Sequence, residues 1–194
     1  MENHKPASHR QKNLPLPGDL PRDQAIAQMI RVDHAGEYGA KRIYQGQLAV
    51  LERSGASAET LAKIKHMAEQ EQGHLDGFNS MMAERRVRPT VLLPLWHVAG
   101  FGLGAVTALL GESAAMACTI AVEEVIDQHY ADQIAQLDGQ EKPLAETLER
   151  YRLEELEHRD EAVNSGGRSS PFTDAITGLV RLGSRTAIFL SERV

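Results

Sequence analysis

The chain has 194 residues, of which 42% are hydrophobic and 25% are charged, and its formal net charge at pH 7 is −6. This length and apolar content suit one globular domain, while the acidic balance and the lack of a nucleic-acid-binding motif argue against a nucleic-acid partner. The one cysteine, Cys118, excludes an internal disulfide and a thiolate-rich zinc or iron–sulfur site within the chain.

The first 21 residues are polar and contain several prolines but no apolar run, which predicts a flexible N-terminal leader over residues 1–21 rather than a secretory signal. Apolar periodicity then predicts four long helices near 22–53, 58–86, 113–138 and 143–164 and a shorter one near 171–191. Glycines and prolines mark the breaks between them. We therefore predict an all-α chain with a single domain over residues 22–194.

The segment between the second and third long helices is unusual, because the 20 residues from Val91 to Leu110 have no formal charge. That length could span a bilayer, but Pro94, three glycines and the interface-type residues Trp96 and His97 argue against a simple span. We expect a membrane-surface patch or an apolar entrance to a site over about 91–110, in preference to a buried crossover helix and above all to a transmembrane anchor. The shorter helix near 171–191 either lies beside this segment or merely covers the bundle.

Each long helix places one glutamate on its apolar stripe, and these residues are Glu37, Glu71, Glu123 and Glu155. His74 and His158 follow Glu71 and Glu155 by three residues, so each Glu-x-x-His pair can reach one ion. Helical phase excludes the neighbouring acids Glu124, Glu154 and Glu157. The doubled pattern, with a long crossover between two helical hairpins, predicts a ferritin-like four-helix bundle with an additional C-terminal helix.

Four buried carboxylates need cations, and two divalent ions would supply the matching positive charge. Oxygen and nitrogen donors without thiolate favour iron or manganese. Asp33 and Asp127 share the stripe and either hold the outer nitrogen of a ligand histidine or lean inward while solvated. Tyr130 is the tyrosine that we would test as a catalytic participant, whereas the other tyrosines and His129 are expected to pack in the core.

At this point the chain resembles the demethoxyubiquinone hydroxylases, which are membrane-associated di-iron monooxygenases. The resemblance runs from about Ile30 to the C-terminus, and the residues that carry it include Arg31-Val32-Asp33-His34-Ala35-Gly36-Glu37-Tyr38-Gly39-Ala40, Arg86-Val87-Arg88-Pro89-Thr90-Val91, Pro94-Leu95-Trp96, Ala121-Val122-Glu123-Glu124, Glu154-Glu155-Leu156-Glu157-His158 and Leu190-Ser191-Glu192-Arg193. It implies two iron ions held by Glu37, Glu71, His74, Glu123, Glu155 and His158, with Glu71 and Glu155 as bridges between them.

The resemblance also implies a reaction, the O2-dependent hydroxylation of a 2-methoxy-3-methyl-6-polyprenyl benzoquinol in ubiquinone biosynthesis. It implies peripheral attachment to the cytoplasmic face of a bacterial cell membrane or, alternatively, to the matrix side of the mitochondrial inner membrane. Other ubiquinone-biosynthesis proteins and a second copy of the chain are the expected protein partners. No nucleotide-binding fingerprint is present, so the electron donor stays open.

Two alternatives remain on the residues alone. A ferritin-like ferroxidase would use a similar bundle without an organic substrate, although the uncharged 91–110 segment disfavours it. A membrane-bound scaffold of a quinone-biosynthesis complex would use the metal for stability alone.

Overall fold

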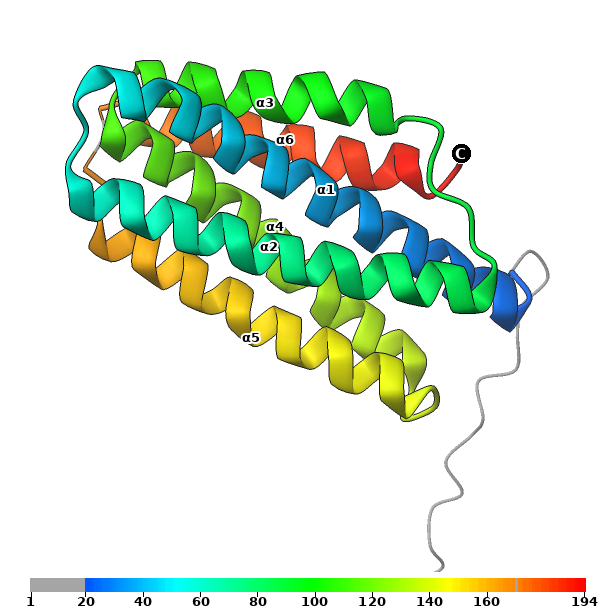
Figure 1. The fold of residues 1–194 in the computed structure, drawn as a ribbon. Helices are drawn as coiled ribbons and strands as arrows, with labels where there is room; N and C mark the ends of the chain where they lie inside the picture. The colour runs from blue at the N-terminus through cyan, green and yellow to red at the C-terminus, as the bar shows by residue number, and fades with distance from the viewer. Residues whose placement is uncertain (1–19, 170) are drawn as a thin grey trace, which may run out of the picture.

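The computed structural model describes residues 20–169 and 171–194, and within them it contains six α-helices and no strand (Figure 1). The helices are α1 (Arg22–Ser54), α2 (Ala58–Arg85), α3 (Leu93–Leu109), α4 (Glu112–Leu137), α5 (Lys142–Asn164) and α6 (Thr173–Ser191). The all-α prediction and the five predicted helices are confirmed, with α3 added in the crossover. Most of the predicted leader, residues 1–19, lies outside the described residues.

Short turns join the two helical hairpins. Gly55 ends α1 in the left-handed conformation with φ 77°, and Ser57 begins α2 by accepting a hydrogen bond from the Thr60 amide on its side chain. Asp138 ends α4, also left-handed, and Pro143 lies in the first turn of α5. Both turns are too short for anything but antiparallel neighbours, so α1 pairs with α2 and α4 pairs with α5.

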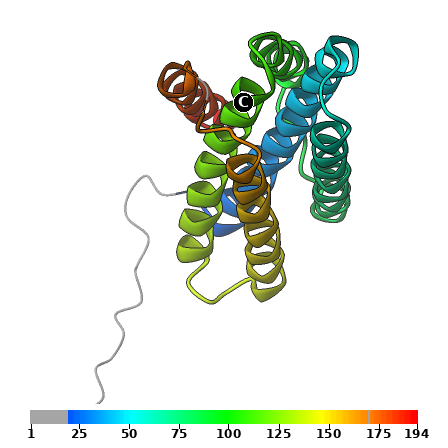
Figure 2. The same cartoon turned by 90° about the vertical axis from the view of Figure 1, so that its left-hand side faces the viewer.

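The six helices form layers. Helices α1 and α4 pack on α2 and α5 respectively on one side, and on α3 and α6 respectively on the other (Figures 1 and 2). The four long helices therefore make the predicted bundle, and α3 and α6 cover the opposite side of α1 and α4. Because α1 and α4 belong to both halves, a residue on either helix can face the bundle core or the space under α3 and α6.

Helix α3 packs very closely on α1 through glycines. A Cβ at Gly100 would lie 2.8 Å from the carbonyl oxygen of Gly39, and one at Gly104 would overlap the carbonyl of Ile43. A Cβ at Gly102 would have no atom within 4 Å. Two of the three crossover glycines thus permit backbone contact between α3 and α1.

The outer faces of α3 and α6 are apolar and exposed. Val98 is 70% exposed and Val106 58% on α3, while Leu179 is 69% and Leu182 65% exposed on α6. The crossover is therefore not a buried helix, and α6 lies beside it instead of only covering the bundle. Across residues 20–169 and 171–194, no helix combines the length and apolarity needed to cross a bilayer.

Candidate metal centre

The six predicted ligands converge in the middle of the bundle. Glu37 on α1, Glu71 on α2, Glu123 on α4 and Glu155 on α5 are each at most 1% exposed, so every long helix turns one carboxylate into the core. The two histidines are also buried, with His74 one turn from Glu71 and His158 one turn from Glu155.

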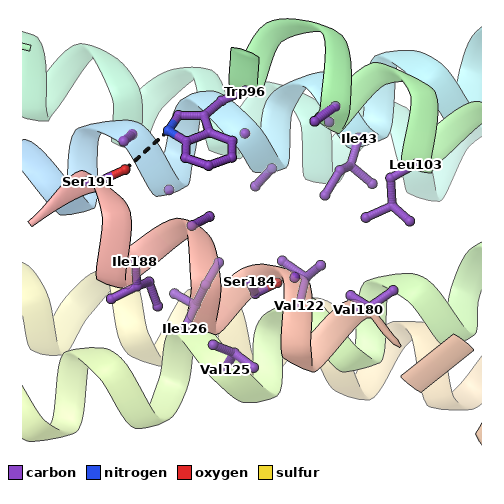
Figure 3. Close-up of a pocket in the computed structure, with 18 of the residues that line it drawn as sticks. Ile43, Trp96, Leu103, Val122, Val125, Ile126, Val180, Ser184, Ile188 and Ser191 are labelled. Carbon is purple, nitrogen blue, oxygen red and sulfur yellow. Dashed lines mark hydrogen bonds between the residues drawn. The ribbon is translucent and has the colours of Figure 1, made fainter. Parts of the chain in front are cut away.

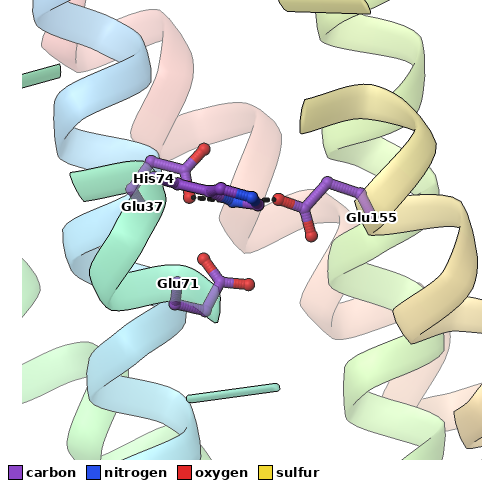
Figure 4. A group of neighbouring side chains, drawn as sticks. All are labelled: Glu37, Glu71, His74 and Glu155. Atoms are coloured by element: carbon purple, nitrogen blue, oxygen red, sulfur yellow. Dashed lines mark ion pairs between the residues drawn. The ribbon is translucent and has the colours of Figure 1, made fainter. Parts of the chain in front are cut away.

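The ligand atoms form two groups that overlap. One group contains Glu37, Glu71, His74 and Glu155 (Figure 4), and the other contains Glu71, Glu123, Glu155 and His158. Within each group, one ligand atom per residue lies within 4.8 Å of all the others. Glu71 and Glu155 belong to both groups. These two groups could hold two adjacent cations, and they share two carboxylates.

The oxygen atoms that face the centre of the bundle fit metal ions and little else. Among the described residues, both carboxylate oxygens of Glu71 and one oxygen each of Glu37, Glu123 and Glu155 are buried without a hydrogen bond. The His74 Nδ1 is also buried without a hydrogen bond and lies 3.0 Å from a Glu155 oxygen. Buried oxygens that accept no hydrogen bond are costly unless a cation binds them, so the donor set suits two divalent ions.

The pKa values of these carboxyl groups also reflect the cost of burying their charges. Burial, and then the charges of the neighbouring carboxylates, raise the pKa of Glu71 well above its usual range, and burial and the Glu155 charge do the same at Glu123. At Glu155, burial is outweighed by the neighbouring imidazoles of His158 and His74, which lower its pKa to about 2. Four ionised glutamates in this buried cluster are too costly unless cations bind them.

Two tyrosines hold the outer carboxylates from the opposite hairpin. The Tyr44 hydroxyl on α1 donates to a Glu123 oxygen at 2.7 Å, and the Tyr130 hydroxyl on α4 donates to Glu37. Each tyrosine lies seven residues after the carboxylate of its own helix, two turns away. One oxygen of Glu37 and one of Glu123 are thereby fixed, while the second oxygen of each faces the centre.

The outer nitrogens of the histidines have partners that the sequence did not predict. The His74 Nε2 lies 2.6 Å from a Glu154 carboxylate oxygen, and the His158 Nε2 lies 3.0 Å from the Gln70 side-chain oxygen. With Nε2 donating to these acceptors, Nδ1 is the nitrogen that faces the carboxylates and that would bind a metal ion. Helical phase placed Glu154 off the apolar stripe, but it carried no signal that Glu154 reaches across to another helix.

Of the two alternatives for Asp33 and Asp127, a contact with the outer nitrogen of a ligand histidine is not what the structure shows. Asp33 instead contacts His129 at 3.1 Å and accepts a hydrogen bond from Gln133 at 2.8 Å, and it is buried. Asp127 forms an ion pair with Arg152 at 2.7 Å. Both aspartates lie four residues from a ligand glutamate, about one turn along their helices. Each therefore points to the same side of its helix as the glutamate but lies at a different position along the helix axis.

The remaining acids near the centre lie outside both ligand groups. Glu124 forms an ion pair with Arg181 of α6 at the surface. Glu157 is exposed to solvent. The structure therefore places Glu124, Glu154 and Glu157 away from the position where a metal ion would bind.

A cavity of about 350 Å³ lies on the other side of α1 and α4, beneath α3 and α6 (Figure 3). Its lining is almost entirely apolar, and near one end the indole nitrogen of Trp96 on α3 donates to the hydroxyl of Ser191 on α6 at 3.1 Å. Gly36, Ala40 and Val122 line the cavity and are close in sequence to Glu37 and Glu123. Helices α1 and α4 thus contribute residues both to the apolar cavity and to the ligand cluster.

Residues 24–191 match the family model described as ubiquinone biosynthesis protein COQ7. A Rhodospirillum rubrum protein named 3-demethoxyubiquinol 3-hydroxylase is 54% identical over 92% of this chain and 83% of its own length. The human protein named NADPH-dependent 3-demethoxyubiquinone 3-hydroxylase, mitochondrial, is 48% identical over 88% of this chain and 78% of its own. The Saccharomyces cerevisiae protein named 5-demethoxyubiquinone hydroxylase, mitochondrial, is 38% identical over all of this chain and 91% of its own.

Proposed function

The chain belongs to the family of the ubiquinone biosynthesis protein COQ7, and on that premise we propose that it is a 3-demethoxyubiquinol 3-hydroxylase with two iron ions at its centre. The observation on which this proposal rests is the pair of overlapping ligand groups inside the bundle. One carbon–hydrogen bond of the quinol ring becomes a carbon–hydroxyl bond. The second oxygen atom of O2 leaves as water and takes up two electrons and two protons.

In this proposal the six residues divide into three pairs. Glu37 and His74 would hold one iron, Glu123 and His158 the other, and Glu71 and Glu155 belong to both groups. Iron bound there would supply the activation of O2. The chain supplies the charge balance, since four carboxylates match two divalent cations, and the dry surroundings in which the reaction occurs.

Tyr130 has a positioning role in this proposal. Its hydroxyl donates to one oxygen of Glu37 and so directs the other oxygen toward the iron. Tyr44 does the same for Glu123. Replacing Tyr130 by phenylalanine should lower the iron affinity of the site that contains Glu37 and leave the other site nearly unchanged, and titration with ferrous iron under anaerobic conditions measures this.

The apolar cavity is the proposed route of the substrate. Its apolar lining suits a prenylated ring, and it includes Gly36 and Val122, the neighbours in sequence of Glu37 and Glu123. The exposed apolar faces of α3 and α6 would rest on the membrane that holds the polyprenyl tail, as a peripheral attachment. The same faces could pack on other quinone-biosynthesis proteins or on a second copy of the chain.

The reaction is tested by reconstitution. Metal-free protein is loaded with ferrous iron under anaerobic conditions and given a short-chain demethoxyquinone, a reductant and then O2. We expect a product heavier by one oxygen atom that forms only when all components are present. Glu123→Ala should abolish the product, whereas the matched control Glu124→Ala, which alters only a surface ion pair, should retain it. Iron oxidation without any hydroxylated product would instead indicate a ferroxidase.

The route is tested by fluorescence, because Trp96 is the one tryptophan in the chain and lines the cavity. A bound quinone should quench its emission in a saturable way. Ala187→Phe would fill part of the cavity from α6 and should weaken this binding at least about tenfold, equivalent to about 1.4 kcal/mol. The neighbouring Thr186→Phe points to solvent and should bind like the unchanged protein. Equal binding by both variants would exclude the cavity as the route.

A further inference from the structure

The two hairpins repeat one pattern, and the repeat includes the partners of the ligand histidines. Gln70 directly precedes Glu71 on α2, and Glu154 directly precedes Glu155 on α5. Each of these two residues reaches across to the histidine of the other hairpin, Gln70 to His158 and Glu154 to His74. Positions 70 and 154 are therefore equivalent in sequence and in contact.

The repeat pairs identical residues at the ligand positions and at the two tyrosines that hold the outer carboxylates. Glutamate matches glutamate at all four ligand positions, histidine matches histidine, and Tyr44 matches Tyr130. The partners of the histidine rings differ, since Tyr151, which stacks on His74, corresponds to Met67. The partners of the Nε2 atoms differ in charge, because position 70 is a neutral amide and position 154 a carboxylate. The contact of the carboxylate with its histidine is 2.6 Å, against 3.0 Å for the amide. A charged acceptor makes the shorter and stronger hydrogen bond.

We propose that Glu154 and Gln70 are positioning residues that make the two metal sites unequal, so that the site of His74 binds its ion first and more tightly. This inference rests on the metal centre of the proposed function. A carboxylate that accepts from Nε2 makes the imidazole a more basic ligand at Nδ1, whereas an amide does so much less. It also adds a negative charge beside one site only.

In the part of the chain that the structure describes, no basic side chain neutralises the Glu154 carboxylate. Within the described ranges Glu154 forms no ion pair with an arginine or lysine, and its side chain is 32% exposed. Its neighbour Arg152 is engaged instead with Asp127 and Glu149. The Tyr151 ring stacks on His74 at 4.1 Å between ring centres and holds the imidazole in the plane that Glu154 reaches. Glu154 therefore adds a carboxylate beside His74, whereas His158 has the neutral Gln70 at the equivalent position.

The test is titration of the metal-free protein with Co²⁺, and with ferrous iron under anaerobic conditions, by calorimetry and absorption. The unchanged protein should bind two ions in two separate steps. Glu154→Gln preserves the shape and the hydrogen bond but removes the charge, and it should weaken the tighter step by about 10- to 100-fold. Gln70→Glu should strengthen the weaker step. Both changes together should exchange the order of the two sites.

The site that fills first is identified by removing its histidine. His74→Ala should eliminate the tighter step and His158→Ala the weaker one, and the double exchange at positions 70 and 154 should reverse this assignment. Glu157→Gln is the matched control, because Glu157 is exposed on the same helix and loses the same charge without contacting either histidine. Thermal melting of each metal-free variant establishes that it folds.

Two results would overturn the inference. One is two equal steps in the unchanged protein. The other is an effect of Glu154→Gln on both steps that is no larger than that of Glu157→Gln. In either case the protein still binds two ions and the proposed function stands. Absence of any stoichiometric metal binding by the folded protein would instead remove the metal centre itself, and with it both proposals.

Discussion

Alanine at Gly104 tests how α3 is seated on α1. A Cβ there would overlap the carbonyl oxygen of Ile43 and lie 2.8 Å from its carbonyl carbon. Because the obstacle is backbone, no side-chain rotation can relieve it and α3 must move away from α1. Overpacking of this kind costs about 1–3 kcal/mol. The gain in helix propensity from glycine to alanine returns about 0.5–1 kcal/mol.

The net expectation is a loss of about 1–2 kcal/mol, which lowers the melting temperature by about 2–8 °C for a chain of this length. Gly102→Ala is the matched control, since no atom lies within 4 Å of its Cβ position and only the propensity gain remains. It should raise the melting temperature by about 1–4 °C. Calorimetric melting of both purified variants provides the measurement. A Gly104→Ala protein that melts as high as Gly102→Ala would refute the close contact of the two helices.

Three further predictions concern other parts of the molecule. Burial raises the pKa of Cys118 to about 12, so iodoacetamide at pH 8 should leave the folded protein unmodified and alkylate it only after unfolding, as mass spectrometry can establish. Trp96→Phe removes the indole donor to the buried Ser191 hydroxyl and should cost about 1–3 kcal/mol in denaturant unfolding, with little added loss when Ser191→Ala is already present. Chelation of the metals should lower the melting temperature, and ferrous iron at about 100 times its dissociation constant should restore about 2.7 kcal/mol per site.

Helical periodicity was sufficient to predict the bundle, because four of the helices are amphipathic and long. The ends of α1, α2, α4 and α5 agree with the predicted ends to within one residue, since capping residues such as Gly55 and Ser57 fix them locally. The phase of each stripe also selected the acids that the structure buries together. The side of a helix to which a residue points depends only on its position within that helix, so it can be predicted from the sequence.

The crossover was less predictable for a physical reason. Its apolar character is the same whether a helix is buried, lies on a surface or spans a bilayer, and periodicity cannot separate these states when nearly every residue is apolar. The decisive contacts are those of Gly100 and Gly104 with the backbone of α1, which depend on the partner helix. The glycines entered the prediction only as an argument against a simple span, whereas at these two positions glycine permits the close packing of α3 on α1.

The hydrogen-bond partners of the two histidine Nε2 atoms could not be predicted either. Helical phase shows to which side of a helix a residue points, but not which residues of other helices lie at the same height in the bundle. Asp33 has the direction of Glu37 but lies four residues away, roughly 6 Å along the axis, and so it meets His129 instead of a ligand histidine. Glu154 has the wrong direction for a metal ligand on its own helix but the right level to reach His74 across the bundle. Once the hairpins are placed, the repeat relates Glu154 to Gln70, and a difference of one functional group between equivalent positions becomes a difference between two metal sites.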